Sequence, residues 1–139
     1  MKHEFITTSQ AQTEIAGQKL AGILAKDDVV VLYGELGSGK TAFARGILSG
    51  LGYSGIVSSP TFTLVNEYET AGFTVAHFDM YRVNNDETLA DAGFYDYLNK
   101  SFIIMEWGDK VPWVMEDVFF KVYIEGAGND PRKIIINRG

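Results

Sequence analysis

The chain has 139 residues, of which 46% are hydrophobic and 22% charged, so we expect one globular domain over residues 1–139. It contains no cysteine, which excludes disulfides, thiol catalysis and thiolate metal sites. Twelve basic residues against 18 acidic ones give a net charge of −6, which argues against direct, high-affinity binding of nucleic acid.

The first half of the chain alternates strand and helix patterns. In order, we predict an edge strand at 5–6, a helix over 11–25, a strand over 29–33 and a helix over 41–51. Thr8 or Ser9 is the expected N-cap of the first helix. The β-branched run at 29–33 is typical of a central strand covered on both faces, and it is far too short to span a bilayer. Since the first residues also lack the apolar block of a signal peptide, we expect a cytoplasmic protein without a membrane partner.

The second half of the chain is richer in strands. We predict strands over 62–69 and 73–78 joined by a turn at 70–72, a helix starting at 84–87, and strands over 102–105, 118–124 and 133–136, with a turn at 126–131. Strand–helix alternation followed by paired strands indicates an α/β fold. Its mixed β-sheet is flanked by helices and carries late antiparallel strands.

The loop after the strand at 29–33 matches the phosphate-binding pattern G-x-x-x-x-G-K-[ST] in full, through Gly34, Gly39, Lys40 and Thr41. Glycines let backbone N–H groups turn toward an anion, and the following helix adds its free N-terminal donors. We therefore predict a single P-loop NTPase domain that binds ATP or ADP with Mg²⁺. The candidate nucleotide-binding residues in this segment are Gly34, Leu36, Gly37, Ser38, Gly39, Lys40, Thr41 and Ala42.

A P-loop also needs an acid at the carboxyl end of a neighbouring strand, and two positions qualify. Glu106 directly follows the predicted strand 102–105, and Asp79 ends the strand 73–78. One carboxylate is expected to ligate magnesium and the other to orient a water, and the sequence leaves their order open. The candidate metal ligands are Thr41, Asp79 and Glu106, and the candidate catalytic residues are Lys40, Asp79 and Glu106.

Four further features near these acids have two interpretations each. Trp107 either lies at the nucleotide or a partner surface, or is a packing aromatic. His77, two residues before Asp79 and therefore on the same face of its strand, is expected to orient a neighbouring carboxylate rather than act as a base. Arg82 either approaches the phosphates or forms a surface ion pair. The hydroxyl-rich segment 58–61 is either a loop that senses the γ-phosphate or a simple turn.

Five segments in this order along the chain resemble the TsaE (YjeE) family of bacterial P-loop ATPases. They are residues 34–41, 59–65 (Ser-Pro-Thr-Phe-Thr-Leu-Val), 77–82 (His-Phe-Asp-Met-Tyr-Arg), 87–93 (Glu-Thr-Leu with a later glycine) and 106–108 (Glu-Trp-Gly). The P-loop alone is common to many families, whereas the second and third segments together are specific. Glu35 departs from the family pattern, in which aspartate is commoner at this variable position.

The resemblance implies a role in making threonylcarbamoyladenosine beside the anticodon of tRNA. The family binds the TsaD–TsaB pair and supports that complex through its ATPase cycle, so contact with tRNA passes only through partners. The resemblance also makes Thr41 and Glu106 the Mg²⁺ ligands, places Asp79 close by, and makes residues 59–61 a switch-like loop. Further nucleotide contacts are implied for three residues: Thr13, Trp107 and Arg132.

Two other functions fit a P-loop: a small-molecule kinase, and a nucleotide-dependent switch without meaningful turnover. A kinase usually clamps the transferred phosphate with arginines, and only Arg45 and Arg82 lie in the middle of this chain. The sequence does not separate an ATPase from a switch, and both stay open. P-loop proteins without an arginine finger are often poor hydrolases, so we expect weak intrinsic ATPase activity that a partner stimulates.

Overall fold

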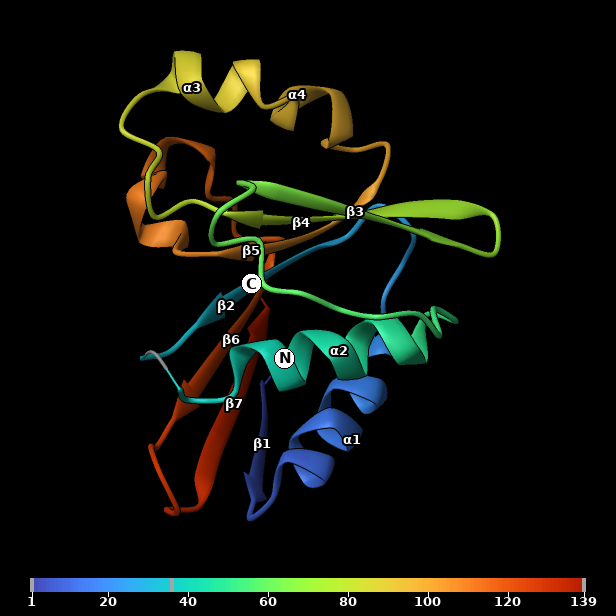
Figure 1. Cartoon of the computed structure of the whole chain (residues 1–139), viewed down its shortest axis with the longest axis vertical. Coiled ribbons are helices and arrows are strands. Elements are labelled where there is room, and N and C mark those ends of the chain that lie inside the picture. Colours follow the sequence, from blue (N-terminus) through green and yellow to red (C-terminus); the bar gives the residue numbers. More distant parts are fainter. Residues whose placement is uncertain (1, 36, 139) are drawn as a thin grey trace.

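The computed structural model describes residues 2–35 and 37–138, which form a seven-stranded mixed sheet with helices on both faces (Figure 1). The strand order is β1-β7-β6-β2-β5-β4-β3. The strands are β1 (Lys2–Thr7), β2 (Val29–Tyr33), β3 (Val65–Thr70), β4 (Phe73–Asp79), β5 (Phe102–Glu106), β6 (Phe120–Glu125) and β7 (Arg132–Arg138). β4, β5, β2 and β6 run parallel to one another, whereas β3, β7 and β1 pair antiparallel with their neighbours. The expected α/β fold with a mixed sheet is confirmed.

Helices cover the two faces of this sheet from different parts of the chain (Figure 1). They are α1 (Gln10–Ala21), α2 (Lys40–Gly50), α3 (Asp86–Asp91), α4 (Phe94–Tyr97) and the 3₁₀ turns η1 (Gly108–Lys110) and η2 (Pro112–Val114). α1 and α2 pack on one face, and α3, α4 and the 3₁₀ turns cover the other. Among residues 2–35 and 37–138, no helix has the length and apolar content needed to cross a bilayer.

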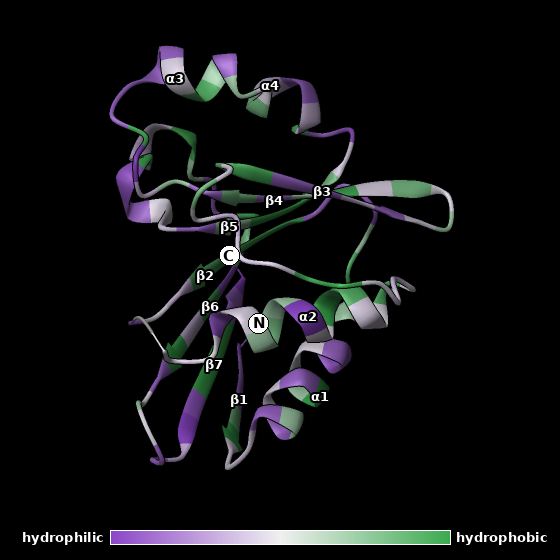
Figure 2. Ribbon diagram, viewed as in Figure 1, coloured by the Kyte–Doolittle hydropathy of each residue, from purple (hydrophilic) through white to green (hydrophobic). Residues whose placement is uncertain are grey.

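The central strands are buried on both faces, as their continuous apolar sequence predicts. In β2, Val30 and Leu32 belong to the core beneath α1 and α2, whereas Val29 and Val31 belong to the core beneath α3 and α4. The ribbon coloured by hydropathy is green along most of β2, whereas β7 is purple at both ends with green between them (Figure 2). The buried centre therefore fixes where the ends of β2, β5 and β4 lie.

α1 and α2 touch backbone to backbone through glycines. A Cβ on Gly46 would lie 2.0 Å from the carbonyl oxygen of Glu14, and one on Gly17 would lie 2.4 Å from that of Phe43. This approach brings Thr13 of α1 beside the phosphate loop, where its Cγ2 would be 3.6 Å from a Cβ on Gly39. The two helices thus form a rigid support for the loop that precedes α2.

Several element boundaries differ from the sequence-based expectation. α1 begins after Ser9, whose Oγ accepts a hydrogen bond from the Gln12 N–H at 3.1 Å, but it ends at Ala21 rather than at residue 25. In the turn that follows, before β2, the Asp28 carboxylate accepts a hydrogen bond from the Ala25 N–H at 2.7 Å. β3 starts at Val65, since residues 61–63 form a turn, and β6 starts at Phe120. The sequence predicted neither α4 nor the two 3₁₀ turns.

Candidate functional site

The phosphate loop joins the end of β2 to the start of α2, as its sequence predicts. Gly37 has φ +80° and Gly39 has φ +111°, a left-handed conformation that favours glycine. Gly39 caps α2 without a side chain, so the first N–H groups of the helix remain available to an anion. The Ser38 Oγ is buried and has no hydrogen-bond partner among the described residues. Leu36, a predicted member of the loop, lies outside the described residues.

Lys40 points into a buried charge cluster at the start of α2. Only 9% of Lys40 is exposed, and its Nζ lies 3.7 Å from Oε1 of Glu106. The other oxygen of that carboxylate, Oε2, is 2.7 Å from Nε2 of His77, which is fully buried. His77 therefore orients a carboxylate, as expected, but this carboxylate is Glu106 on the adjacent strand and not Asp79 of its own strand.

Glu106 remains ionised despite its burial. Desolvation is the largest influence and by itself raises the pKa of this carboxyl. The hydrogen bond and charge of His77, together with the positive charge of Lys40, act in the opposite direction and outweigh it. The pKa of Glu106 therefore lies below its usual value, and the site holds a fixed negative charge between two nitrogen groups.

Asp79 lies beside Glu106 at the same edge of the sheet. The two residues are register partners at the ends of the parallel strands β4 and β5. Asp79 is buried, and its Oδ1 accepts a hydrogen bond from the Tyr81 N–H at 2.9 Å. Thr41 and both carboxylates line one cavity, which is a donor set suited to Mg²⁺, an ion that takes one or two carboxylates and keeps waters. The described residues contain no group of three or more His, Cys, Asp or Glu side chains arranged for a metal.

Trp107 connects the buried charges to the protein surface. Its backbone is left-handed, with φ +62°, which turns the chain sharply after Glu106. The indole ring lies 4.6 Å from the Lys40 Nζ and packs edge-to-face on Tyr81, with ring centroids 4.9 Å apart. Trp107 lines the candidate cavity and also packs, half-buried, against the core beneath α3 and α4, so the structure fits both interpretations of this residue.

These groups surround a cavity of about 580 Å³, which we call the phosphate-loop cavity. The sequence-predicted residues that line it are Thr13, Gly37, Ser38, Gly39, Lys40, Thr41, Ala42, Asp79, Glu106, Trp107 and Arg132. Gly34 lines a neighbouring cavity instead, and a Cβ there would approach the Ser38 Oγ to 2.5 Å. Gly34 is therefore required by the packing of the loop and does not line the phosphate-loop cavity.

Arg132 reaches the site from the start of β7 and binds backbone carbonyls. Its Nε donates to the Ser38 oxygen at 2.8 Å, and its Nη2 donates to the Gly37 oxygen at 3.2 Å. The same guanidinium donates to the carbonyl oxygens of Gly128 and Asp130 in the β6–β7 loop. Arg132 thus clamps the phosphate loop to the β6–β7 loop while forming part of the cavity wall.

Two hydroxyl pairs complete the cavity wall. The Thr13 and Thr7 hydroxyls lie 2.8 Å apart, and those of Ser59 and Thr61 lie 2.7 Å apart. Arg82 does not line this cavity: its guanidinium stacks 5.3 Å from the ring of Phe62, which is 87% exposed. The surface ion pair considered for Arg82 is likewise absent among the described residues.

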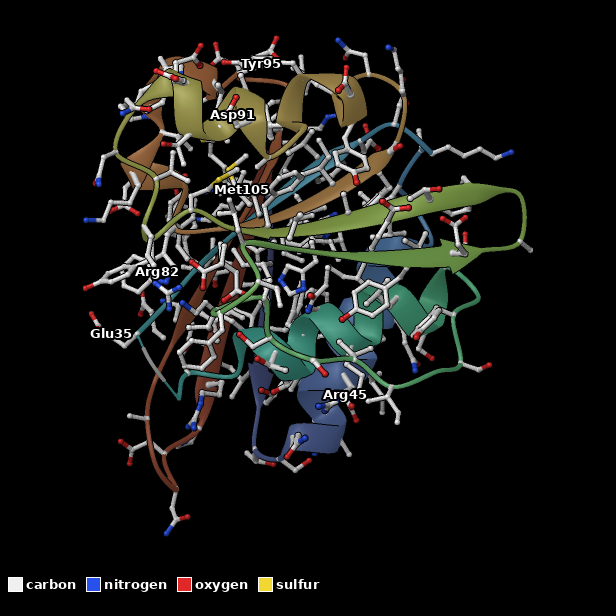
Figure 3. All side chains as sticks on the ribbon, turned by 45° about the horizontal axis from the view of Figure 1, so that its top comes forward. Glu35, Arg45, Arg82, Asp91, Tyr95 and Met105 are labelled. Atoms are coloured by element: carbon white, nitrogen blue, oxygen red, sulfur yellow. The ribbon has the colours of Figure 1, made fainter. Side chains whose placement is uncertain are left out.

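The sequence missed some wall residues altogether. Residues 7–10 and 128–130 line the cavity, although their patterns indicated only a helix cap and a turn. Arg45 of α2, labelled in Figure 3, also lines it, and its Nη1 forms an ion pair with Oε1 of Glu14 in α1 at 2.9 Å. The sequence could not show that these residues line the cavity, because the contact between α1 and α2 and the order of the strands bring them to the phosphate loop.

The chain is similar to known proteins in both sequence and structure. The family model of the threonylcarbamoyl adenosine biosynthesis protein TsaE matches residues 7–134. The chain is 41% identical over 115 residues to the tRNA threonylcarbamoyladenosine biosynthesis protein TsaE of Haemophilus influenzae, covering 78% of this chain and 73% of that one. It is 32% identical to the Bacillus subtilis protein of the same name, covering 92% and 80%. The crystal structure of Bacillus subtilis YdiB superposes with a TM-score of 0.81 at 27% identity, covering 98% of this chain and 84% of that one.

Proposed function

Since this chain belongs to the TsaE family of threonylcarbamoyl adenosine biosynthesis proteins, we propose that it is a magnesium-dependent ATPase acting with a TsaD–TsaB complex. Family membership supports the role in tRNA threonylcarbamoyladenosine biosynthesis. The observation that carries the ATPase proposal is the position of Lys40, buried at the N-terminus of α2 between Glu106 and the phosphate loop. With a net charge of −6, the protein reaches tRNA only through its partners.

The site residues fit a nucleoside triphosphate with magnesium. The orphaned Ser38 Oγ and the uncapped N–H groups of α2 supply donors for phosphate oxygens. Lys40 exchanges its contact with Glu106 for the β- and γ-phosphates, which are the stronger anionic partners. Thr41, Glu106 and Asp79 would hold the metal, which when bound neutralises charge that develops on the phosphates.

The two carboxylates, Glu106 and Asp79, have different proposed roles. Glu106 is held by His77 and cannot rotate freely, which suits a group that keeps one fixed position beside the metal. Asp79 accepts only from the backbone N–H of Tyr81 within the described part of the chain, so one of its oxygens remains available to orient a water. No arginine of this chain is assigned to the transferred phosphate, which agrees with slow turnover in isolation.

A direct test is titration calorimetry with ATP in the presence and absence of Mg²⁺, followed by phosphate-release assays with and without TsaD–TsaB. We expect binding with metal, turnover well below 10 s⁻¹ alone, as expected for a P-loop protein without an arginine finger, and stimulation by the partner complex. Absence of ATP binding would refute the P-loop assignment. Binding without any hydrolysis, even with partners, would leave the nucleotide-dependent switch as the function.

The switch has its own structural support in the loop 59–61. The hydroxyls of Ser59 and Thr61 line the phosphate-loop cavity beside Asp79 and Glu106, where a γ-phosphate would add charge. A ligand shifts a conformational equilibrium only through its different affinities for the two states. We therefore expect TsaD–TsaB to bind the ATP-analogue, ADP and nucleotide-free forms with different affinities. Equal affinities, together with an unaltered Thr61→Ala variant, would show that the loop is only a turn.

A further inference from the structure

A second cavity lies on the other side of the phosphate loop. It measures about 400 Å³ and opens between the end of β2, the end of β6 and η1. Its distinctive side chains are three aromatic rings and three carboxylates: Tyr33, Trp107, Tyr123, Glu35, Asp109 and Glu125. We call it the tyrosine cavity, and the proposed ATPase function uses none of these residues except Trp107.

The aromatic wall is preformed by the sheet. Tyr33 and Tyr123 are register partners on the parallel strands β2 and β6, and their rings stack with centroids 4.9 Å apart and an angle of 12°. The Tyr33 hydroxyl also donates to the Met115 Sδ at 3.7 Å. Burial, followed by the proximity of Tyr123 and Asp109, raises the pKa of Tyr33, so the phenol stays neutral at neutral pH. The stacked pair therefore forms one wall of the cavity, and the Tyr33 phenol in it is uncharged.

The rim of the cavity carries excess negative charge. Glu35, Asp109 and Glu125 are all exposed, and none of them forms an ion pair with another residue of the described segments 2–35 and 37–138. Two lysines are close: Lys40 lines the cavity but pairs with Glu106, and Lys133 is opposite Glu125 in the β6–β7 register. The net charge around the cavity is therefore negative, which favours the binding of one further positively charged group.

We propose that the tyrosine cavity binds an organic cation, namely the guanidinium group of an arginine presented by a partner protein. Aromatic faces attract cations, and a planar guanidinium can stack on a ring while donating to carboxylates. The volume of about 400 Å³ accommodates a single long side chain. Because Lys40 and Trp107 line both cavities, the arginine would bind next to the phosphate loop.

The test uses the free protein without nucleotide, so its outcome is independent of the ATPase proposal. ¹⁵N-labelled protein is titrated with N-acetyl-argininamide, with the uncharged isostere N-acetyl-citrullinamide, and with spermidine. The indole N–H signal of Trp107 reports on the cavity. Trp113, whose Nε1 donates to Asp86 at 2.8 Å and which does not line the cavity, is the internal reference.

We expect N-acetyl-argininamide to shift the Trp107 signal saturably, and N-acetyl-citrullinamide to bind at least about threefold more weakly. Tyr123→Leu and Glu125→Gln should each lower the affinity for N-acetyl-argininamide by about threefold or more, whereas the surface control Asp117→Asn should leave it unchanged. Glu125 is exposed, so its variant is expected to fold even if the tyrosine variant does not.

Equal binding of the charged and uncharged amides, or unaltered binding to the Glu125→Gln variant, would overturn the proposal. No saturable shift with either cation would overturn it as well. Tighter binding of spermidine than of N-acetyl-argininamide would keep the cation site but refute a partner arginine, assigning the site to a small polyamine.

Discussion

The parallel centre of the sheet differs from one of its margins, where β6 pairs parallel with β2 but antiparallel with β7, and β1 pairs antiparallel with β7. In the centre, formed by β2, β4 and β5, nearly every side chain is buried, and all five residues of β5 are. In the margin, formed by β6, β7 and β1, buried and accessible residues alternate along β6, because α1 covers only one face. The open face of the margin carries Lys121 and Lys133 beside the apolar Ile6 and Ile135.

This difference separates the residues proposed for catalysis from those that support them. Parallel strands bring their carboxyl ends to one edge, which is why Asp79, Glu106 and the phosphate loop meet there. The margin contributes two strand residues: Arg132, at the start of β7, clamps the phosphate loop, and Tyr123 of β6 forms part of the tyrosine cavity. Changes in the centre should therefore remove function, whereas changes in the margin should modulate it.

The largest effect is expected for Lys40→Ala in the centre. The variant should bind ATP more than about 100-fold more weakly and lose hydrolysis, because charge-assisted contacts to two phosphates disappear. Calorimetry with ATP and Mg²⁺ measures the affinity, and the exposed Lys26→Ala is the matched control. Wild-type affinity in the Lys40 variant would contradict the assignment of the loop.

The two acids should differ, although they are register partners. Glu106→Gln should slow hydrolysis more than about 100-fold, since it removes the fixed charge beside Lys40. Asp79→Asn should slow it about tenfold, as expected for a carboxylate that acts through the water it orients. Binding of ADP without metal should survive in both variants, because the phosphate cradle is made of backbone donors. If Asp79→Asn has the greater effect in the phosphate-release assay, the order of the two acids is reversed.

Arg132→Ala tests how far the margin can influence the centre. Loss of the hydrogen bonds to the Ser38 and Gly37 carbonyls frees the phosphate loop, and ATP affinity should fall about tenfold. Arg132→Lys should not restore it, because an ammonium lacks the planar fork that reaches several carbonyls at once. The neighbouring Lys133→Ala is the control. An unaltered affinity in Arg132→Ala would mean that the loop holds its shape without the clamp.

The centre could be predicted from the sequence because its signals are local. The β-branched run of β2, the glycines of the loop and the acids after two apolar strands each show their role within a few residues. The sequence also predicted that His77 orients a carboxylate, although its place in the strand pointed to Asp79. What the sequence could not decide is that the carboxylate belongs to Glu106, since this depends on β4 lying next to β5.

The contacts of the margin could not be predicted from the sequence, because they depend on which strands pair in the folded sheet. Arg132 reaches Ser38 across 94 positions of the chain, and Tyr33 stacks on Tyr123 only because β6 adds beside β2. No spacing rule encodes either contact. The same holds for the hydroxyl residues 7–9. Their sequence predicted the cap of α1 correctly, but their place in the cavity wall follows from how α1 packs on α2.

The smallest effect is expected on the open face of β1, where adjacent residues point to opposite faces. Phe5 packs on the core beneath α1, whereas Ile6 is 65% exposed. Phe5→Ala should lower the free energy of unfolding by about 1–3 kcal/mol, because it removes half-buried apolar surface. Ile6→Ala should change it by less than about 0.5 kcal/mol, as is usual for a surface position.

Urea unfolding followed by far-UV circular dichroism measures both variants under the same conditions, with Phe5→Ala as the reference for a covered position in the same strand. Since both substitutions put alanine in one edge strand, the difference in strand propensity is small and the contrast reports burial. A loss above about 1 kcal/mol for Ile6→Ala would show that this face is covered in solution, because an exposed side chain has too few contacts to lose that much. The margin would then be buried on both faces like the centre, and the proposed distinction between the two regions would fail.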